Sequence, residues 1–235
     1  MENNHSKPGT LFIVATPIGN LSDITLRAIE TLKSVDLIAC EDTRVTRVLL
    51  DHFEIKKPTI SYFQHSQLSK IEYLISELSS GKNIALVTDA GTPGISDPGQ
   101  ELIARIKNYE SRIKVVPIPG VSALTAAASV SGMIEKEFYF AGFLPKKKGR
   151  MTKFNALNKL DIPIVIYESA NRLEKTLGDI KTYFGDKVEV FIAREITKMF
   201  EEYWGGNIDE VISDLAKHQM KGEIVLIVNK LSVNK

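Results

Sequence analysis

Cysteine is almost absent from this sequence, since Cys40 is the single one among 235 residues. A disulfide within the chain is therefore excluded, which suits a reducing cytosol, and we expect a cytoplasmic protein. Cys40 ends the apolar run VDLIAC, where a small buried side chain is the simplest expectation. No apolar run approaches the length of a membrane span, and the polar start MENNHSKPGT lacks the apolar stretch of a signal peptide. We expect neither a membrane segment nor a leader.

Several motifs of common enzyme classes are also missing. No G-x-G-x-x-G follows the first apolar segment, which argues against dinucleotide binding and against a Rossmann-class methyltransferase. The sequence has no G-x-x-x-x-G-K-[ST], no H-E-x-x-H, no C-x-x-C and no G-x-S-x-G, which argues against P-loop, zinc and α/β-hydrolase sites. The four histidines are scattered, so we expect no metal site.

Charge of one sign is not in excess. The 30 Lys and Arg residues almost balance the 29 Asp and Glu residues, which gives a formal net charge of +1. A near-neutral chain needs a local cationic patch to bind nucleic acid. Its hydrophobic content of 43% is ordinary for a globular protein with a sizeable core.

Strand and helix patterns alternate along the chain. Apolar runs predict strands at 10–17, 35–40, 83–89 and 114–119, and later at 137–145, 162–169, 188–195 and 223–230. Helical spacing predicts helices at 22–34, 68–81, 99–110, 122–133, 171–185 and 208–219, the first capped by Ser22 or Asp23. We therefore predict an α/β fold of two domains, 1–119 with a parallel sheet and 120–235 with a mixed sheet, and a ligand cleft between them.

Four predicted strands end in unusual turns. The turns are ATPIGN (15–20), TDAGTPGISDPG (88–99), PIPGVSA (117–123) and IYESANR (166–172). Glycine lets a ligand approach the backbone closely, and proline makes a loop rigid. Gly and Pro also turn chains for no other reason, but ligands bind beyond the carboxyl ends of parallel strands. Four such loops together indicate a binding site.

The motifs TPIGNLSDIT, CEDTR, DAGTPGISDPG, PGVSA, GFLP, YESANRL, ARE.TK and KGE occur in this order across nearly the whole chain. In this set the sequence resembles the small-subunit ribosomal RNA (cytidine-2′-O)-methyltransferase I family. That family belongs to the tetrapyrrole-methylase-like class III methyltransferases, which use S-adenosylmethionine. The resemblance implies a cytoplasmic homodimer that binds S-adenosylmethionine between its two domains and methylates a cytidine of the decoding region, in ribosomal RNA or in the assembled small subunit.

The resemblance also implies which residues line the cofactor. Those expected at the methionine and sulfonium end come from the long turn: Asp89, Gly91, Thr92, Ile95 and Ser96. Pro17 would bound the pocket, and Ser122 and Ala123 would face the cofactor from the next strand end. By motif position alone, the adenosine would be flanked by Tyr167, Ala193 and Gly222.

Methyl transfer to a ribose hydroxyl requires in-line orientation and a group that takes up the hydroxyl proton. Two carboxylates are candidate catalytic bases, Asp42 in CEDTR and Glu168 in YES. Each has a structural alternative. Asp42 fits the cap of a helix over TRVTRVLL, and Glu168 stands one helical turn before Arg172.

Cationic side chains are concentrated in a few segments. The candidates for RNA contact are Arg44, Arg47, Lys146, Lys147, Lys148, Arg150, Arg194 and Lys198. The run KKKGR is equally typical of a solvated loop, and the ARE.TK motif fits either a phosphate clamp or an ion-pair network. We favour RNA contact for KKKGR, because a near-neutral chain has gathered charge there.

Two rival functions remain open. A tetrapyrrole or other small-molecule methyltransferase of the same class would share the fold and the cofactor but leave KKKGR idle. A non-catalytic RNA-binding protein would keep a degenerate fold, which the intact DAGTPGISDPG disfavours.

Overall fold

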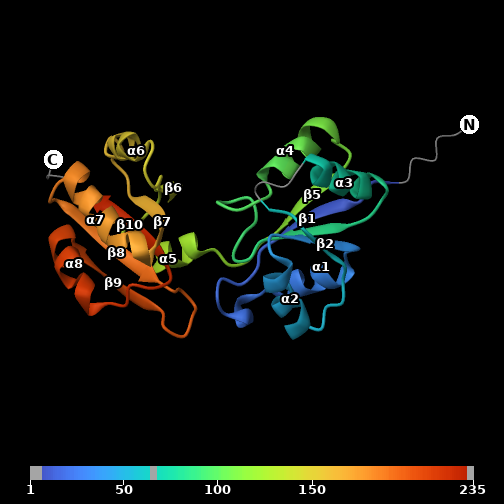
Figure 1. Cartoon of the computed structure of the whole chain (residues 1–235), viewed down its shortest axis with the longest axis horizontal. Coiled ribbons are helices and arrows are strands. Elements are labelled where there is room, and N and C mark those ends of the chain that lie inside the picture. Colours follow the sequence, from blue (N-terminus) through green and yellow to red (C-terminus); the bar gives the residue numbers. More distant parts are fainter. Residues whose placement is uncertain (1–6, 64–67, 232–235) are drawn as a thin grey trace, which may run out of the picture. The chain divides into compact units, whose positions relative to one another are not determined.

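The computed structural model describes residues 7–63 and 68–231, which form two compact units, Met1–Ser122 and Ala123–Lys235. Each unit consists of a five-stranded sheet with helices packed against it (Figure 1). The predicted α/β fold is therefore confirmed. The boundary predicted after residue 119 stays a prediction, three residues before this division. In the part of the chain that the structure describes, no helix is long and apolar enough to cross a membrane.

The first unit is a doubly wound parallel sheet. Its strands are β1 (Thr10–Val14), β2 (Leu37–Cys40), β3 (Thr59–Ser61), β4 (Ile84–Val87) and β5 (Lys114–Ile118), in the order β3-β2-β4-β1-β5. Its helices are α1 (Leu26–Ser34), α2 (Thr43–His52), α3 (Leu68–Ser79) and α4 (Gln100–Tyr109), with a short 3₁₀ turn η1 (Leu21–Asp23). All strand pairs in this sheet are parallel.

Alternation along the central strands explains the two cores of this unit. Leu37 and Leu86 contribute to the core that includes α3 and α4, whereas Ile38 and Val87 contribute to the core that includes α1 and α2. Figure 1 shows these helix pairs on opposite faces of the sheet. Every residue of β2 and β4 is buried, as expected for strands covered on both faces. Cys40 is buried as predicted.

The second unit has a mixed sheet. Its strands are β6 (Tyr139–Phe143), β7 (Ile164–Ser169), β8 (Val188–Arg194), β9 (Glu202–Asn207) and β10 (Glu223–Lys230), in the order β6-β7-β10-β8-β9. Its helices are α5 (Ala123–Ser131), α6 (Arg150–Leu157), α7 (Ala170–Phe184) and α8 (Ile208–Asp214), followed by the 3₁₀ turn η2 (Leu215–Lys217). Only β6 and β7 pair in parallel among its described strands.

The main core of the second unit fills one face of this sheet. Side chains from α6, α7 and α8 pack there against alternate residues of the strands, such as Ile166, Ile192 and Leu226. The other face carries aromatic rings and is partly covered by α5, which packs on β10.

Four elements are absent from the sequence prediction: β3, β9, α2 as an asserted helix, and α6. β3 has only three residues and lies at a sheet edge, so it leaves little pattern. β9 contains Gly205, where a Cβ would lie 2.5 Å from the Val190 carbonyl oxygen, so close strand packing requires a residue with low strand propensity. The cap of α1 was also wrongly assigned: Thr25 caps it, because Ser22 and Asp23 belong to η1.

Candidate functional site

The loop between β4 and α4, residues 88–99, begins at the point in the first sheet where the connecting helices change from one face to the other. β4 lies between β2 and β1. The chain leaves β1 and β2 toward α1 and α2 on one face, and it leaves β4 toward α4 on the other. Where connections from neighbouring parallel strands leave to opposite faces, a crevice opens beyond the carboxyl ends of the strands. Ligands bind there in open α/β sheets.

Hydrogen bonds fix this loop to the end of β1. The Thr16 amide donates to the Gly91 carbonyl at 2.9 Å, and the Gly91 amide donates back to the Thr16 carbonyl at 3.0 Å. The buried Thr16 hydroxyl donates to the Thr88 carbonyl at 3.0 Å. The strand end and the loop therefore form one rigid body. Pro17, the next residue after Thr16, is buried at its base.

The same loop is fixed to the end of β2. The Asp42 amide donates to Asp89 Oδ1 at 3.1 Å, and the Thr88 hydroxyl donates to Glu41 Oε2 at 2.9 Å. Desolvation raises the pKa of Asp89 above its ordinary value, and the nearby carboxylates of Glu41 and Asp42 raise it further. A cation would relieve this concentration of negative charge.

The loop alternates between exposed and buried residues. Ile95 is 51% exposed, and Ser96 and Asp89 are exposed as well. Gly91 has φ of 85°, a conformation that favours glycine. Gly99 has φ of 138°, and a Cβ there would lie 2.9 Å from Leu86 Cδ2, so only glycine lets the chain enter α4 this close to the core.

The end of β5 joins the same edge of the sheet. The Thr92 hydroxyl lies 3.5 Å from the Val121 carbonyl oxygen, which it donates to. A Cβ on Gly120 would lie 3.0 Å from Ala15 Cβ, so this turn packs directly on the end of β1. Ser122 follows as the last residue of the first unit, and Ala123 begins α5 in the second. The structure thus gathers the predicted residues from Pro17 to Ser122 at one sheet edge.

Asp42 serves as the N-cap of α2. Its carboxylate accepts from the Arg44 amide at 2.8 Å and pairs with the Arg44 guanidinium at 2.6 Å. The hydrogen bonds from Arg44 lower the pKa of Asp42 to about 2. The helix-cap alternative for Asp42 therefore describes its geometry, although Asp42 also lies at the edge that carries the loop.

Glu168 is fully buried in the second unit, and its structural alternative also describes its geometry. Its Oε1 pairs with Arg172 Nε at 3.1 Å and accepts from the Ser169 amide at 2.9 Å. Its Oε2 accepts from the Thr176 hydroxyl at 2.7 Å. Both oxygens are engaged and the side-chain exposure is 0%, which argues against a direct contact with a substrate hydroxyl in this arrangement; the assignment of Glu168 as a base stays a prediction.

The three residues expected near the adenosine lie close together within the second unit. Tyr167 and Ala193 are both paired with Val225, on either side of β10, and so share one face of the sheet. Gly222 directly precedes β10, with φ of 95°, and its carbonyl accepts from the Ala170 amide at 3.0 Å. Their contact with a cofactor stays a prediction.

The predicted cations divide into exposed and buried groups. Those exposed are Arg44, Arg47, Lys146, Lys147 and Lys148. Arg150 and Arg194 are buried, because their guanidinium groups satisfy carbonyls and carboxylates of the second unit. Lys198 pairs with Glu195 at 2.7 Å and with Glu223 at 3.0 Å. The internal partners of Arg150 and Arg194 argue against contact with RNA, and the assignment of these two residues to RNA stays a prediction.

Sequence reasoning missed the residues that hold this site together. Thr16 and Thr88 fix the loop, and Thr176 links Glu168 to Arg150, yet none of them was singled out. Thr16 and Thr88 lie within the quoted turns ATPIGN and TDAGTPGISDPG, which is the one signal available. Within residues 7–63 and 68–231, no three His, Cys, Asp or Glu side chains are placed to hold a metal ion.

Comparison with known proteins places this geometry in a family. The model of the tetrapyrrole (corrin/porphyrin) methylases matches residues 10–231. Ribosomal RNA small subunit methyltransferase I of Synechocystis sp. is 47% identical over 221 residues, covering 94% of this chain and 78% of that protein. The protein of the same name from Thermotoga maritima is 46% identical over 221 residues, covering 94% and 98%.

Solved structures share the fold at low identity. The methyltransferase CobJ superposes with a TM-score of 0.70 at 14% identity, covering 97% of this chain and 96% of that one. The uroporphyrin-III C-methyltransferase of Thermus thermophilus, complexed with S-adenosylhomocysteine, has a TM-score of 0.65 at 16% identity, covering 94% and 97%. The predicted tetrapyrrole-methylase-like fold is confirmed.

Proposed function

Because this chain belongs to the ribosomal RNA small subunit methyltransferase I family, within the tetrapyrrole methylases, we propose that it methylates small-subunit ribosomal RNA with S-adenosylmethionine as methyl donor. The observation that carries the proposal is the identity of 47% to a relative of that name across 94% of the chain. The finer assignment, to the 2′-oxygen of a cytidine in the decoding region, rests on the motifs TPIGN, DAGTP and YESANRL.

S-adenosylmethionine fits the exposed edge of the first unit. The cofactor carries a positive sulfonium and a positive ammonium group, and the raised pKa of Asp89 marks a place where positive charge is favourable. We assign cofactor contacts to the loop between β4 and α4 and to its neighbours Pro17 and Ser122. When bound, the cofactor would supply an electrophilic methyl group, because its positive sulfonium sulfur leaves as a neutral thioether.

The chain's own residues must orient the ribose and take up its proton. Asp42 stays the proposed base, because it lies at the edge that carries Asp89, at 3.1 Å through its amide. Its pKa of about 2 keeps it ionised at neutral pH but makes it a weak acceptor. We therefore expect orientation by the rigid loop to supply more of the rate than proton transfer does.

RNA contact is assigned to the exposed cations Arg44, Arg47 and Lys146–Lys148. Each phosphate contact contributes a salt-dependent term to affinity. We further propose that the protein acts as a homodimer in the cytoplasm; α5, rich in Ala and Ser, supports close helix packing. The substrate is either the free RNA or the assembled small subunit.

The test is labelling of small-subunit RNA from cells that lack the protein. Purified protein and radiolabelled S-adenosylmethionine are added to intact small subunits and, separately, to deproteinised RNA, and the labelled nucleotide is mapped. We expect one ribose-methylated cytidine. Labelling of a porphyrinoid but no RNA would assign a tetrapyrrole substrate, and absence of cofactor binding would assign a non-catalytic role.

An Asp42→Asn variant tests the base in the same assay. Asn still caps a helix, so the fold should persist while the rate falls by about 10²-fold. Asp51→Asn on the same helix makes the same charge change and should leave the rate intact. Since the pKa of Asp42 is about 2, the wild-type rate should be flat from pH 6 to pH 9; a rise near pH 7 would assign the base to another group.

A further inference from the structure

A cationic loop leaves β6 and leads into α6. It carries Lys146, Lys147 and Lys148, all exposed, and ends at Gly149, whose φ is 80°. Within the described residues, no hydrogen bond or ion pair engages the three ammonium groups. Three cations on consecutive residues repel one another, so other residues must hold the backbone that carries them.

Two arginines hold the start of this loop by consecutive carbonyls. Arg172 of α7 donates from its Nη2 to the Leu144 carbonyl at 2.7 Å. Arg150, the first residue of α6, donates from its Nη1 to the Pro145 carbonyl at 3.1 Å. The backbone immediately before Lys146 is therefore bound at two successive positions by side chains from two different helices.

The two arginines are themselves fixed by a buried network. Arg150 Nε pairs with Asp179 at 2.7 Å, and its Nη2 donates to the Thr176 hydroxyl at 2.9 Å. The Thr176 hydroxyl donates to Glu168, which pairs through its other oxygen with Arg172. The chain of contacts thus runs from one carbonyl of the loop to the next without a gap. We name the five side chains the arginine clamp: Arg150, Glu168, Arg172, Thr176 and Asp179.

Burying the charged side chains of the arginine clamp costs desolvation free energy. Side-chain exposures of 8% for Arg150 and 0% for Glu168 mean that both charges have lost most of their water. Apolar side chains of similar volume often stabilise a fold as well as a buried ion pair does. Apolar side chains cannot donate hydrogen bonds to the Leu144 and Pro145 carbonyls, whereas directional donors can fix the loop in one conformation.

We propose that the arginine clamp holds Lys146–Lys148 in a preformed arrangement that receives RNA phosphates. The inference rests on the proposed function. It makes Glu168 and Arg150 positioning residues, in place of the base and the phosphate ligand that their motifs suggested. A preformed loop binds without the entropic cost of ordering the backbone of the three lysines on contact.

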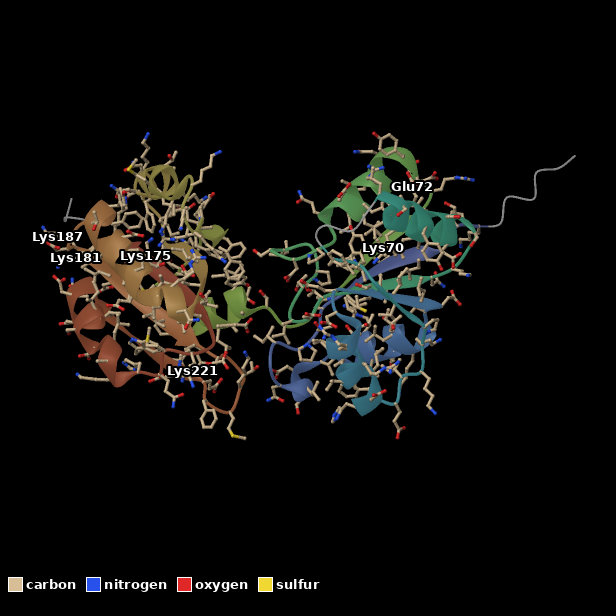
Figure 2. The ribbon with its side chains drawn as sticks, in the orientation of Figure 1. Lys70, Glu72, Lys175, Lys181, Lys187 and Lys221 are labelled. Atoms are coloured by element: carbon tan, nitrogen blue, oxygen red, sulfur yellow. The ribbon has the colours of Figure 1, made fainter. Side chains whose placement is uncertain are left out.

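One substitution separates the two explanations, because they predict opposite changes in RNA affinity. Asp179→Asn removes a negative charge from the protein, so long-range electrostatics alone predicts tighter RNA binding. A weakened clamp predicts weaker RNA binding, because Arg150 loses the negative charge of its partner and holds the Pro145 carbonyl less firmly. The matched control is Asp209→Asn, which removes the same charge from the exposed pair of Asp209 with Lys181. Figure 2 labels Lys181, which belongs to α7. Within the described residues, the hydrogen bonds and ion pairs of Asp209 and Lys181 include none with residues 144–149.

The first measurement is RNA affinity against salt. Full-length wild type, Asp179→Asn, Asp209→Asn and the triple variant Lys146→Ala, Lys147→Ala, Lys148→Ala are titrated with small-subunit RNA from 50 to 200 mM KCl. The triple variant should flatten the log–log slope by about two units, at roughly 0.7 per phosphate contact. Asp179→Asn should weaken binding at least about threefold and move its slope toward that of the triple variant. Asp209→Asn should match or exceed wild-type affinity.

A double-mutant cycle separates positioning from general destabilisation. Added to the triple variant, Asp179→Asn should cause no further loss of RNA affinity, because the lysines that it positions are already gone. Thr176→Ser, which keeps the bridging hydroxyl, should retain affinity, whereas Thr176→Val should lose it. Affinity for S-adenosylmethionine should stay within about twofold in all variants, since its proposed loop lies in the other unit. Amide exchange at residues 144–149 should quicken in Asp179→Asn and Thr176→Val.

The outcomes are distinct. Wild-type affinity and slope in Asp179→Asn, or an additive loss in the triple background, would overturn the clamp while the proposed function stands. Quicker exchange with unchanged RNA affinity would also overturn it. A wild-type protein that neither binds nor methylates small-subunit RNA would overturn the proposed function and this inference with it.

Discussion

Gly91 meets two requirements at one position of the candidate site. Its amide and carbonyl both bond to Thr16, and its φ of 85° is one that side chains with a Cβ avoid. Space is not the constraint, since a Cβ there would meet Ile18 Cγ2 at an ordinary 3.6 Å. The residue is thus needed for its backbone conformation and for the register of the loop.

Gly91→Ala should destabilise the protein by about 1 kcal/mol and weaken S-adenosylmethionine binding about tenfold, because the loop must shift to relieve the strain. The control is Gly185→Ala at the end of α7, where φ is 84° and a Cβ meets nothing within 4 Å. That variant should lose similar stability and keep its cofactor affinity. Urea unfolding and calorimetry make the comparison. Equal cofactor affinity in the two variants would remove the loop from the site.

The edge strand β9 shows how one carboxylate can hold an element in place. Glu202 pairs with Arg194 Nε of β8 at 3.1 Å and with His218 Nδ1, just after η2, at 2.5 Å. The ring of His218 stacks on Trp204 of the same strand, with centroids 4.1 Å apart. The hydrogen bond with His218, and then that with Arg194, hold the pKa of Glu202 below its ordinary value.

This lowered pKa predicts a pH-dependent stability. A carboxyl group whose folded pKa is depressed stabilises the fold above its unfolded pKa, near 4.5, and that contribution is lost as pH falls through the folded value. Glu202→Gln should therefore cost about 1 kcal/mol at pH 7, and the difference from wild type should shrink toward pH 3. Glu189→Gln on the exposed side of β8 is the matched control. A difference that stays constant with pH would show that the ion pairs of Glu202 contribute nothing.

At the scale of the whole molecule, two units contribute different materials to the proposed reaction. In this proposal the first unit supplies a sheet edge for the cofactor, and the second supplies a cationic loop for RNA. The helix α5 begins the second unit and is nearly all Ala, Ser and Thr with Leu124 and an exposed Val130. Small side chains of this kind allow close packing between helices.

We predict that the protein is a homodimer with twofold symmetry, the commonest closed arrangement of identical chains. Sedimentation velocity at about 1–10 μM, where a dimer with a Kd well below about 1 μM is almost fully formed, should give twice the mass of one chain. Val130→Glu should shift this distribution toward monomer, because it places charge on the exposed face of α5, whereas Val48→Glu on α2 serves as the control. A wild-type monomer throughout this range would reject the dimer.

The sequence by itself determined the α/β class, eight of the ten described strands and the four strand-end turns. It could do so because these depend on apolar periodicity and on glycine and proline, which act within a few residues. It also determined the family, because the motifs from TPIGN to KGE lie in order along one chain. The sequence did not predict the short edge strand β3 or the glycine-containing β9, because their pairing depends on neighbours distant in sequence.

Only the tertiary structure decided which residues of the candidate site stand together and what each can do. The strand order places β4 between β2 and β1, and so brings Asp89 against Asp42 and Gly91 against Thr16. Burial separated Arg150 from Lys148, two residues away in a run that reads as uniformly cationic. The physical reason is that desolvation and partner geometry are properties of the packed chain: a carboxylate or guanidinium becomes a base, a ligand or a support only when its neighbours in space are known.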